Sequence, residues 1–554
     1  MMRIWTNLLI GRRACSSALL LCVICAFLPA QKRTSAGANA GGGFRIAGTV
    51  LNIATGDPVQ RAVVSALAEG DNHTIASAIS DAEGRFSLEG LPAAKYPLTA
   101  SKRGFRTALY DDHDGYNTAI VTGPDQDTTH LIFFLAPGAV LHGVVSGDGG
   151  DPVEGARVML FEKPRHHTQE DRIVQSDSAV TDDTGAYEFG NLADGDYLVA
   201  VSAQPWYAMH RANDAPRNGA TETNAQLDVA YPITYFDSTW DEASATPIAL
   251  AKGSRVEADI NLHAVPALRI TVDAPRRPDG RLARPELQQM VFGTQISAES
   301  VGFIEALKRG TAEFNGIAPG HYELTAGDPL RFVELDATES GHIDSDAGSA
   351  TVAVTGMLRM PRGGLPPDEA HLFLQPQEGA QSHANLATSV HNGRFHFESV
   401  APGTWTVTVE GDGKMMPVLS VGTDGPAHAG NGLTVRDHPL NVVVTLGEGT
   451  ARIDGIAQKD GKGFGGAMIV LVPKEQGNLE ALARRDQSDS DGSFSLRDVV
   501  PGPYTIVAIE DGWELDWTQP GALARYLPSG TAVTVNDSSG DVLHLSGPVV
   551  VEPR

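Results

Sequence analysis

The stretch QSDSDGSFSLRD, residues 487–498, carries three carboxylates at the spacing of part of a calcium-binding loop. Asp489, Asp491 and Asp498 would supply the oxygen ligands that calcium prefers. Gln487 stands at the first ligand position, and an Asp rather than a bidentate Glu closes the loop. An ordinary turn closed by an Asp side chain explains the same residues. The sequence therefore allows two interpretations of this stretch, a calcium site and a structural turn. It indicates no other cofactor.

A second candidate for metal chemistry is the His-x-x-Glu pair of His167 and Glu170. Zinc catalysis needs a third ligand and a base in a formed pocket, and no downstream His with a supporting motif follows. We interpret the pair as part of a solvated loop. No nucleophile, base and orienting residue fall into a catalytic pattern, and no phosphate-binding loop is present. The sequence therefore predicts a protein that is not an enzyme and has no catalytic residue.

Aromatic residues gather in two stretches, an insertion over residues 204–247 and a segment near the C-terminus. The ligand-binding candidates are Trp206, Tyr207, Tyr235, Trp240, Trp513 and Trp517. Flat aromatic side chains beside acids and amides can stack on sugar rings and bind hydroxyl groups. The alternative is that they pack these long loops onto their own domains. The first interpretation predicts weak binding of a neutral glycan, which needs exposed aromatic planes.

These residues must be positioned by a unit that recurs five times along the chain. Each copy has a glycine, an apolar residue four positions later, and an aromatic residue twelve positions later. The glycines are Gly84, Gly185, Gly310, Gly393 and Gly492, and the aromatics are Tyr96, Tyr197, Tyr322, Trp405 and Tyr504. In the best copies an Asp stands three positions before the glycine, where its side chain can close a turn. The glycine then supplies the positive φ that such a turn needs.

Each aromatic residue opens a segment in which apolar and polar residues alternate, which is typical of a half-buried strand. Strand and Gly-rich turn patterns precede the best copies, as in residues 46–67, and further strand pairs follow them. About seven short strands per unit predict a β-sandwich. Residues 479–485 are the one stretch that suggests a short helix. The predicted fold is therefore all-β, a tandem array of about five transthyretin-like or immunoglobulin-like sandwiches.

The repeat also predicts the domain organisation of the 554-residue chain, which is too long for one core. The third and fourth copies are degenerate, because Leu307 and Val390 replace the turn Asp. The predicted segments are 1–40 (signal peptide and short linker), 41–136, 137–264 (with the insertion 204–247), 265–347, 348–446 and 447–554.

The N-terminus predicts export. Arg3, Arg12 and Arg13 precede the short apolar run 17–30, which is typical of a signal peptide cleaved between Ala30 and Gly41. An uncleaved anchor is the alternative.

All three cysteines, Cys15, Cys22 and Cys25, lie in this segment, so the mature chain would hold no disulfide. An exported chain without disulfides suits the periplasm, the outer surface or the exterior of a Gram-negative-type bacterium.

Charge narrows the range of partners. The whole chain has a formal net charge of −26. Without the five bases of residues 1–40, 37 Lys and Arg face 68 Asp and Glu, a net charge of −31. Such a chain repels phosphate backbones and anionic lipid surfaces. The sequence therefore predicts neither nucleic-acid binding nor membrane insertion of the mature chain.

The composite pattern GxVxxxxGxPVxGAxVxL followed by DxxGxFxLxxLPPGxYxLxV resembles the carboxypeptidase regulatory-like domain family. The match is good in the first, second and fifth units, and the better matches cover roughly two-thirds of the chain. The resemblance implies a transthyretin-like seven-stranded sandwich and a non-catalytic accessory module of exported or surface bacterial proteins. The sandwich that the resemblance implies is also similar to folds that bind starch-like glycans.

The function expected is an exported structural or interaction scaffold whose partner is a protein or a neutral glycan of the cell envelope. One alternative is a carbohydrate-binding protein that uses the aromatics of the second and fifth units. The other is an accessory component of a cell-envelope complex.

Overall fold

The computed structural model describes residues 43–554, which form one compact unit, apart from short gaps. The gaps are 71, 164–172, 210–224, 274–284, 298–310, 327–329, 345–347, 361–363, 368, 378–384, 412–413, 424–427, 448–450, 475–478, 520 and 537–541. The predictions for the signal peptide, for the cysteines and for His167 and Glu170 lie outside the described residues, as does Gly310.

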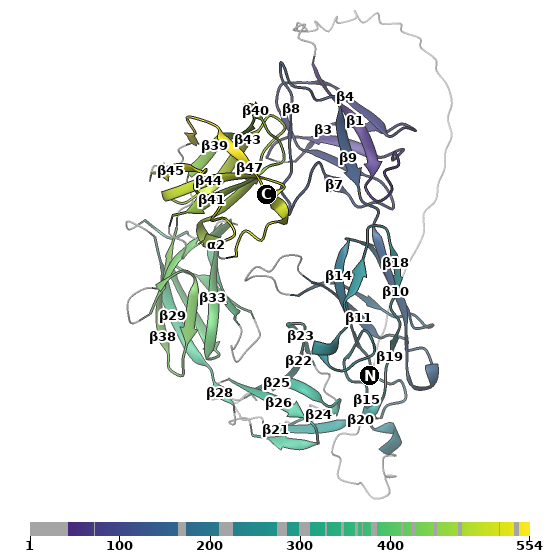
Figure 1. The fold of residues 1–554 in the computed structure, drawn as a ribbon. Coiled ribbons are helices and arrows are strands. Elements are labelled where there is room, and N and C mark those ends of the chain that lie inside the picture. The colour runs from purple at the N-terminus through teal and green to yellow at the C-terminus, as the bar shows by residue number, and fades with distance from the viewer. Residues whose placement is uncertain are drawn as a thin grey trace, which may run out of the picture. The chain divides into compact units, whose positions relative to one another are not determined.

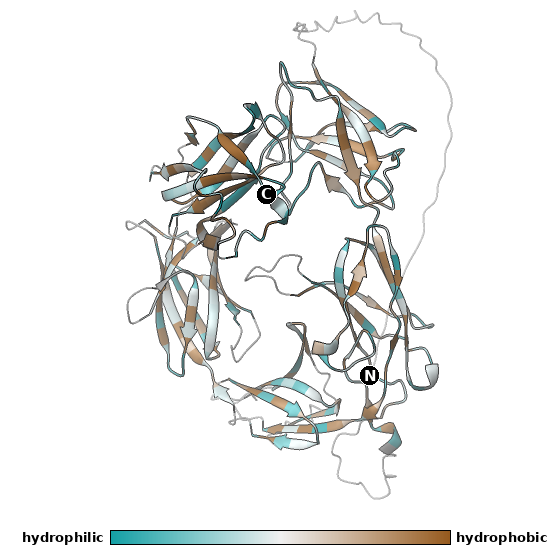
Figure 2. Cartoon of the chain, in the orientation of Figure 1, coloured by the Kyte–Doolittle hydropathy of each residue, from teal (hydrophilic) through white to brown (hydrophobic). Residues whose placement is uncertain are grey.

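The described chain is all-β, as predicted, and its strands carry most of the apolar residues (Figures 1 and 2). The first sandwich packs the sheet β4-β1-β9 against the sheet β3-β2-β6-β7, and the ribbon β5-β8 lies beside them. Its strands are β1 (Phe44–Asn52), β2 (Val63–Leu67), β3 (Thr74–Ile79), β4 (Arg85–Leu91), β5 (Lys95–Tyr96), β6 (Leu98–Ser101), β7 (Ala108–Leu109), β8 (Ile120–Val121) and β9 (Leu131–Leu135).

The second sandwich repeats this arrangement, with sheets β13-β10-β18 and β12-β11-β14-β16 and a ribbon β15-β20; β19 also pairs with β10, and β17 with β14. Its strands are β10 (Ala139–Ser146), β11 (Arg157–Glu162), β12 (Val174–Val180), β13 (Ala186–Leu192), β14 (Gly195–Ser202), β15 (Val229–Ala230), β16 (Thr234–Tyr235), β17 (Ile248–Leu250), β18 (Arg255–Glu257), β19 (Ile260–Asn261) and β20 (Val265–Pro266).

The third sandwich has sheets β24-β21-β27 and β23-β22-β25-β26-β28. Its strands are β21 (Leu268–Asp273), β22 (Glu286–Val291), β23 (Thr294–Ser297), β24 (Thr311–Ile317), β25 (Gly320–Ala326), β26 (Arg331–Ala337), β27 (Gly341–Ile343) and β28 (Ser349–Ala350).

The fourth sandwich has sheets β32-β29-β38-β35-β36 and β31-β30-β33-β34, and β37 pairs with β33. Its strands are β29 (Val352–Arg359), β30 (Ala370–Pro376), β31 (Leu386–Val390), β32 (Arg394–Val400), β33 (Gly403–Gly411), β34 (Lys414–Met416), β35 (Val418–Gly422), β36 (His428–Ala429), β37 (Gly432–Val435) and β38 (Leu440–Leu446).

The fifth sandwich joins its two sheets through β47, which pairs with both β39 and β44. Its strands are β39 (Ala451–Lys459), β40 (Lys462–Gly463), β41 (Met468–Pro473), β42 (Arg484–Gln487), β43 (Ser493–Val499), β44 (Gly502–Glu510), β45 (Thr531–Val535), β46 (Val542–His544) and β47 (Val549–Pro553). The predicted helix over 479–485 is shorter in the structure, where α2 spans Leu479–Leu482. Short 3₁₀ turns lie at Asp148–Gly150, Ala225–Leu227, Glu242–Ser244 and Gly512–Glu514.

Each sandwich has its own apolar core, and the repeat aromatics lie in these cores. The polar tip of each ring donates a hydrogen bond to the carbonyl oxygen four residues earlier. The pairs are Tyr96–Pro92, Tyr197–Ala193, Tyr322–Ala318, Trp405–Ala401 and Tyr504–Val500, at 2.8–3.3 Å. The repeat thus selects Tyr or Trp rather than Phe, because the ring fills the core while its polar tip satisfies a turn carbonyl.

Candidate interaction site between the first and last sandwiches

The turn Asp of the repeat has two different roles in this chain. In the first two sandwiches it closes its own turn: Asp81 accepts backbone hydrogen bonds from Glu83 and Arg85, and Asp182 accepts the equivalent pair. Gly84 and Gly185 have φ of +75° and +73°, as predicted. In the fifth sandwich Asp491 takes over a bond of this kind, from the backbone N–H of Ser493 at 2.9 Å. The carboxylate of Asp489 still accepts a hydrogen bond from the Ser493 hydroxyl at 3.3 Å, and it can also make a contact outside its own turn.

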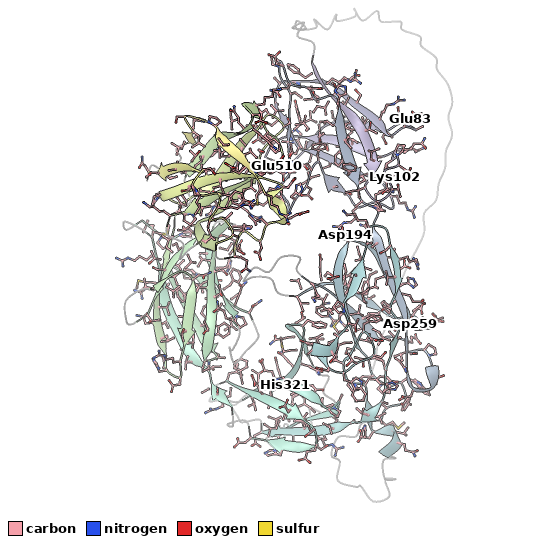
Figure 3. All side chains as sticks on the ribbon, in the orientation of Figure 1. Glu83, Lys102, Asp194, Asp259, His321 and Glu510 are labelled. Atoms are coloured by element: carbon pink, nitrogen blue, oxygen red, sulfur yellow. The ribbon has the colours of Figure 1, made fainter. Side chains whose placement is uncertain are left out.

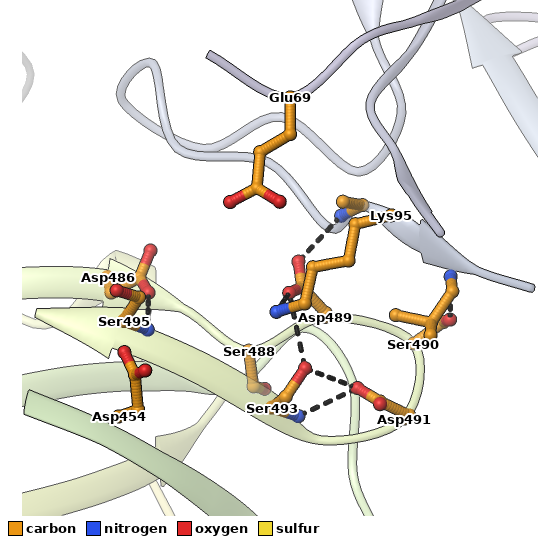
Figure 4. Close-up of polar contacts among 12 residues, drawn as sticks. Glu69, Lys95, Asp454, Asp486, Ser488, Asp489, Ser490, Asp491, Ser493 and Ser495 are labelled. Carbon is orange, nitrogen blue, oxygen red and sulfur yellow. Dashed lines mark hydrogen bonds and ion pairs between the residues drawn. The ribbon is translucent and has the colours of Figure 1, made fainter. Parts of the chain in front are cut away.

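Asp489 makes that contact with the first sandwich (Figure 4). Its Oδ2 lies 2.5 Å from Nζ of Lys95, and its Oδ1 accepts a hydrogen bond from the backbone N–H of Ala119 at 3.1 Å. The next residue, Ser490, donates its backbone N–H to the Ala119 carbonyl at 3.0 Å. Its hydroxyl accepts from the N–H of Val121 at 2.9 Å. The turn of the fifth sandwich therefore binds backbone and side chain of β5 and β8.

The Lys95–Asp489 ion pair is partly shielded from water, since the two side chains retain 30% and 13% of their exposure. Burial alone would lower the pKa of Lys95, but the hydrogen bond and charge of Asp489 raise it. Burial raises the pKa of Asp489, although Lys95 and the Ala119 N–H favour its ionised form. Removing one partner would leave the other charge desolvated, which costs more than the pair itself contributes.

A buried glutamine extends the contact. Gln487 at the end of β42 donates its amide N–H groups to the Asp111 carbonyl at 2.6 Å and to the Thr118 hydroxyl at 2.8 Å. Thr118 in turn donates to Oδ2 of Asp111 at 2.7 Å. Gln487 and Thr118 are buried, and buried polar groups whose hydrogen bonds are satisfied fix a single geometry.

Aromatic stacking completes the site. Trp513 is buried, and the rings of His113 and Tyr116 from the first sandwich stack on it at centroid distances of 5.6 and 5.2 Å. The guanidinium of Arg485 lies 5.6 Å from the same ring and pairs with Asp114 of the first sandwich at 3.5 Å. The site therefore combines an ion pair, a buried amide and an aromatic stack, the features by which specific protein interfaces are recognised.

The first sandwich, which the Asp489 turn contacts, matches a known domain family. A family model described as "Carboxypeptidase regulatory-like domain" matches residues 45–132 and 140–228. These two segments are carboxypeptidase regulatory-like domains. They coincide with the first sandwich and most of the second, so the fifth sandwich docks onto the first regulatory-like domain.

Similarity to other proteins is distant. No curated protein matches this sequence. The Bacillus anthracis TIE protein is 12% identical over 74% of this chain and 76% of its own, with a TM-score of 0.17. GBS52, a minor pilin of Streptococcus agalactiae, is 15% identical over 42% and 98%, with a TM-score of 0.20. BcpA, the major pilin subunit of Bacillus cereus, is 12% identical over 75% and 98%, with a TM-score of 0.14. TM-scores this low support no conclusion about function or assembly.

Two of the three carboxylates that the sequence suggested for calcium stay together, because Asp489 and Asp491 both accept a hydrogen bond from the Ser493 hydroxyl. Asp489 binds Lys95 of the first regulatory-like domain, Asp491 binds Ser493, and Asp498 lies in β43 with a φ of +53°. Across the described residues, no three His, Cys, Asp or Glu side chains are grouped as metal ligands. Calcium binding stays a prediction.

The aromatic candidates also separate. Trp206 is 90% exposed with Tyr207 edge-on to it at 5.8 Å, and Trp240 is 50% exposed. The expectation of exposed planes is wrong for Tyr235 and Trp513, which are buried. Tyr235 in β16 packs in a cluster between the second and third sandwiches, and Trp513 lies under the rings of the first sandwich. Trp517 is partly buried, 5.0 Å from the Arg485 guanidinium. Residues 210–224 of the insertion lie outside the described residues.

Sequence reasoning missed Lys95, Thr118 and Ala119 of the first regulatory-like domain and the docking role of Gln487. No local motif marks these residues, because their partners lie about 370–394 positions away in the chain. Two signals were available: Trp513, a large aromatic outside the repeat core, and the apolar run of β41, which is buried on both faces. Separately, among the described residues no helix has the length and apolar character needed to span a bilayer.

Proposed function

We propose that the protein is an exported, non-catalytic scaffold of β-sandwich modules in which the last sandwich docks onto the first. The observation that carries this proposal is the shielded contact of Lys95 and Ala119 with Asp489. A scaffold that holds two of its own modules together presents the others at fixed positions. The regulatory-like domains support a non-enzymatic role.

The proposed site of action is the bacterial cell envelope, with another protein as partner. The basic and apolar N-terminal pattern supports export, and the acidic mature chain argues against nucleic acid and anionic lipid. The Gram-negative assignment stays a prediction.

Charge reversal in the full chain tests the docking. Lys95→Glu and Asp489→Lys each place like charges together, and the double variant restores an opposite pair. We expect small-angle scattering to give a larger radius of gyration for each single variant and the wild-type value for the double variant. Lys474→Glu reverses an exposed lysine of the fifth sandwich elsewhere and is the matched control. Single variants that keep the wild-type radius would contradict the proposal.

Glycan binding is the second candidate, and the exposure of Trp206 and Trp240 favours it. A neutral glycan stacked on these rings would bind with a dissociation constant on the order of micromolar to millimolar. The double variant Trp206→Ala/Trp240→Ala should lose both this binding and the accompanying quenching of tryptophan fluorescence, at an unchanged melting temperature. Equal binding by wild type and double variant would exclude these two rings as the site.

A further inference from the structure

The strand β9 of the first sandwich is apolar on both of its faces. Phe133 and Leu135 point into the core, whereas Ile132 and Phe134 on the opposite face retain 51% and 47% exposure. Ile53, which follows β1, is exposed beside them. A solvated face of an antiparallel sandwich is normally polar, so an apolar outer face of this kind marks an interaction surface.

This outer face forms part of a cleft of about 1160 Å³. The docking contact supplies a second wall, which includes Leu515 and Trp517 of the fifth sandwich. The second sandwich supplies Glu162 and the loop residue Asp194, which is labelled in Figure 3. A cleft of this size accommodates a ligand of several residues.

The cleft also runs along two sheet edges. β9 ends the sheet β4-β1-β9, and β7 ends the sheet β3-β2-β6-β7. Residues 106–115, which include β7, line the cleft continuously. An edge strand presents backbone N–H and C=O groups to which an extended polypeptide can add. This geometry favours a polypeptide over a sugar.

The charges that line the cleft indicate which kind of polypeptide it would bind. Lys252 and Arg485 each pair with a carboxylate of the cleft walls, at 3.9 and 3.5 Å. Arg106 is the one further cation among the described residues that line the cleft. The further carboxylates include Asp112, Glu162 and Asp516. The cleft therefore has an excess of negative charge, which favours basic side chains on its ligand.

We propose that this cleft binds an extended peptide segment that carries alternating apolar and basic side chains. The apolar side chains cover Ile132 and Phe134, and the basic ones face Asp112 and Asp516. The proposal rests on the docking of the fifth sandwich onto the first, because the two supply opposite walls.

Fluorescence anisotropy with the full chain tests it. The probe is a fluorescein-labelled peptide of about ten residues that alternates Val and Lys and is about 33 Å long in extended form. We expect saturable binding, about tenfold weaker for Phe134→Ser because an apolar contact is lost. Val180→Ser, an exposed position on β12 of the second sandwich, is the matched control and should bind within about twofold of wild type.

Four results would overturn the proposal: no saturable binding, equal binding of a peptide with Glu in place of Lys, an unchanged affinity in Phe134→Ser, or displacement of the peptide by maltoheptaose. The last result would assign the cleft to a neutral glycan.

The Lys95→Glu chain separates this proposal from the docking on which it rests. If its radius of gyration rises as expected but the wild type binds no peptide, the cleft proposal alone fails. If its radius is unchanged while peptide binding still depends on Phe134, the docking fails and the site reduces to the outer face of β9.

Discussion

At the scale of single residues, one repeat position serves two purposes. Asp81 and Asp182 hold their own turns, and the pKa of each carboxyl is lowered, mainly by hydrogen bonds from the turn. Asp489 occupies the equivalent position, keeps a hydrogen bond from the Ser493 hydroxyl of its own turn, and also binds another sandwich. The sequence predicted the turn at all three positions from the Asp and Gly spacing. The sequence could not predict the contact of Asp489 with the first sandwich, because a side chain's partner across an interface leaves no periodic signal.

We expect the loss of stability at a repeat aromatic to grow with the number of atoms removed from its side chain. Tyr504 is buried and donates its hydroxyl to the Val500 carbonyl at 2.8 Å. Tyr504→Phe removes only this bond and should cost about 1 kcal/mol of the free energy of unfolding. Tyr504→Ala also leaves a cavity and should cost about 3 kcal/mol or more. Thermal unfolding of the full chain measures both, and equal losses would show that the hydroxyl, not the ring, carries the contribution.

A partly buried carboxyl in the fifth sandwich, that of Asp486, predicts that stability depends on pH. Burial raises the pKa of Asp486 to about 6, against the two backbone hydrogen bonds that favour its charge. Because the folded pKa lies above the unfolded value, the contribution of Asp486 to stability is present at low pH. It is lost as the pH rises from about 4 through 6.

Asp486→Asn should remove this dependence. Between pH 4 and pH 7 the wild type should lose roughly 1–3 kcal/mol relative to the variant. Hydrogen exchange of the adjacent strand β43 at several pH values reports the stability of the fifth sandwich. Parallel pH profiles for the two proteins would contradict the assignment.

At the scale of elements, strands that are apolar on both faces mark the places where sandwiches meet something else. In β11, Val158 and Leu160 face the core, whereas Met159 and Phe161 face Val291 and Phe292 of the third sandwich. β41 of the fifth sandwich is buried throughout and forms a second cluster with Trp513 on its outer side. The alternation of apolar and polar residues predicted the strands. Strands with apolar residues on both faces, such as β11 and β41, indicated in addition where modules contact one another.

The contribution of the apolar cluster between the second and third sandwiches to the free energy of unfolding can be measured. Phe292 packs edge-on to Phe161 at 5.0 Å and to Tyr235 at 5.1 Å. Phe292→Ala should lower the free energy of unfolding of this pair of sandwiches by about 3 kcal/mol. The control Val174→Ala, at an exposed position of β12, should change it by less than about 0.5 kcal/mol. Similar melting curves for the two variants would mean that the modules unfold independently of this cluster.

At the scale of the whole molecule, the sequence predicted the sandwich fold and its repetition because cores repeat a local pattern. The docking of the last sandwich onto the first depends on surface residues far apart in the chain, and composition predicts nothing about it. The chain has a formal net charge of −26, so the ion pairs Lys95–Asp489 and Arg485–Asp114 between the first and fifth sandwiches are local exceptions to a general repulsion between acidic modules.

Hydrogen exchange of two backbone amides tests whether the fifth sandwich docks onto the first. The N–H groups of Ala119 and Val121 donate to the side chains of Asp489 and Ser490 across the contact. In the wild-type chain both amides should exchange slowly. In Lys95→Glu their exchange should accelerate by about tenfold or more, while the first sandwich's core strands stay protected. Fast exchange of both amides in the wild type, or identical rates in the two proteins, would contradict the docking of the fifth sandwich onto the first.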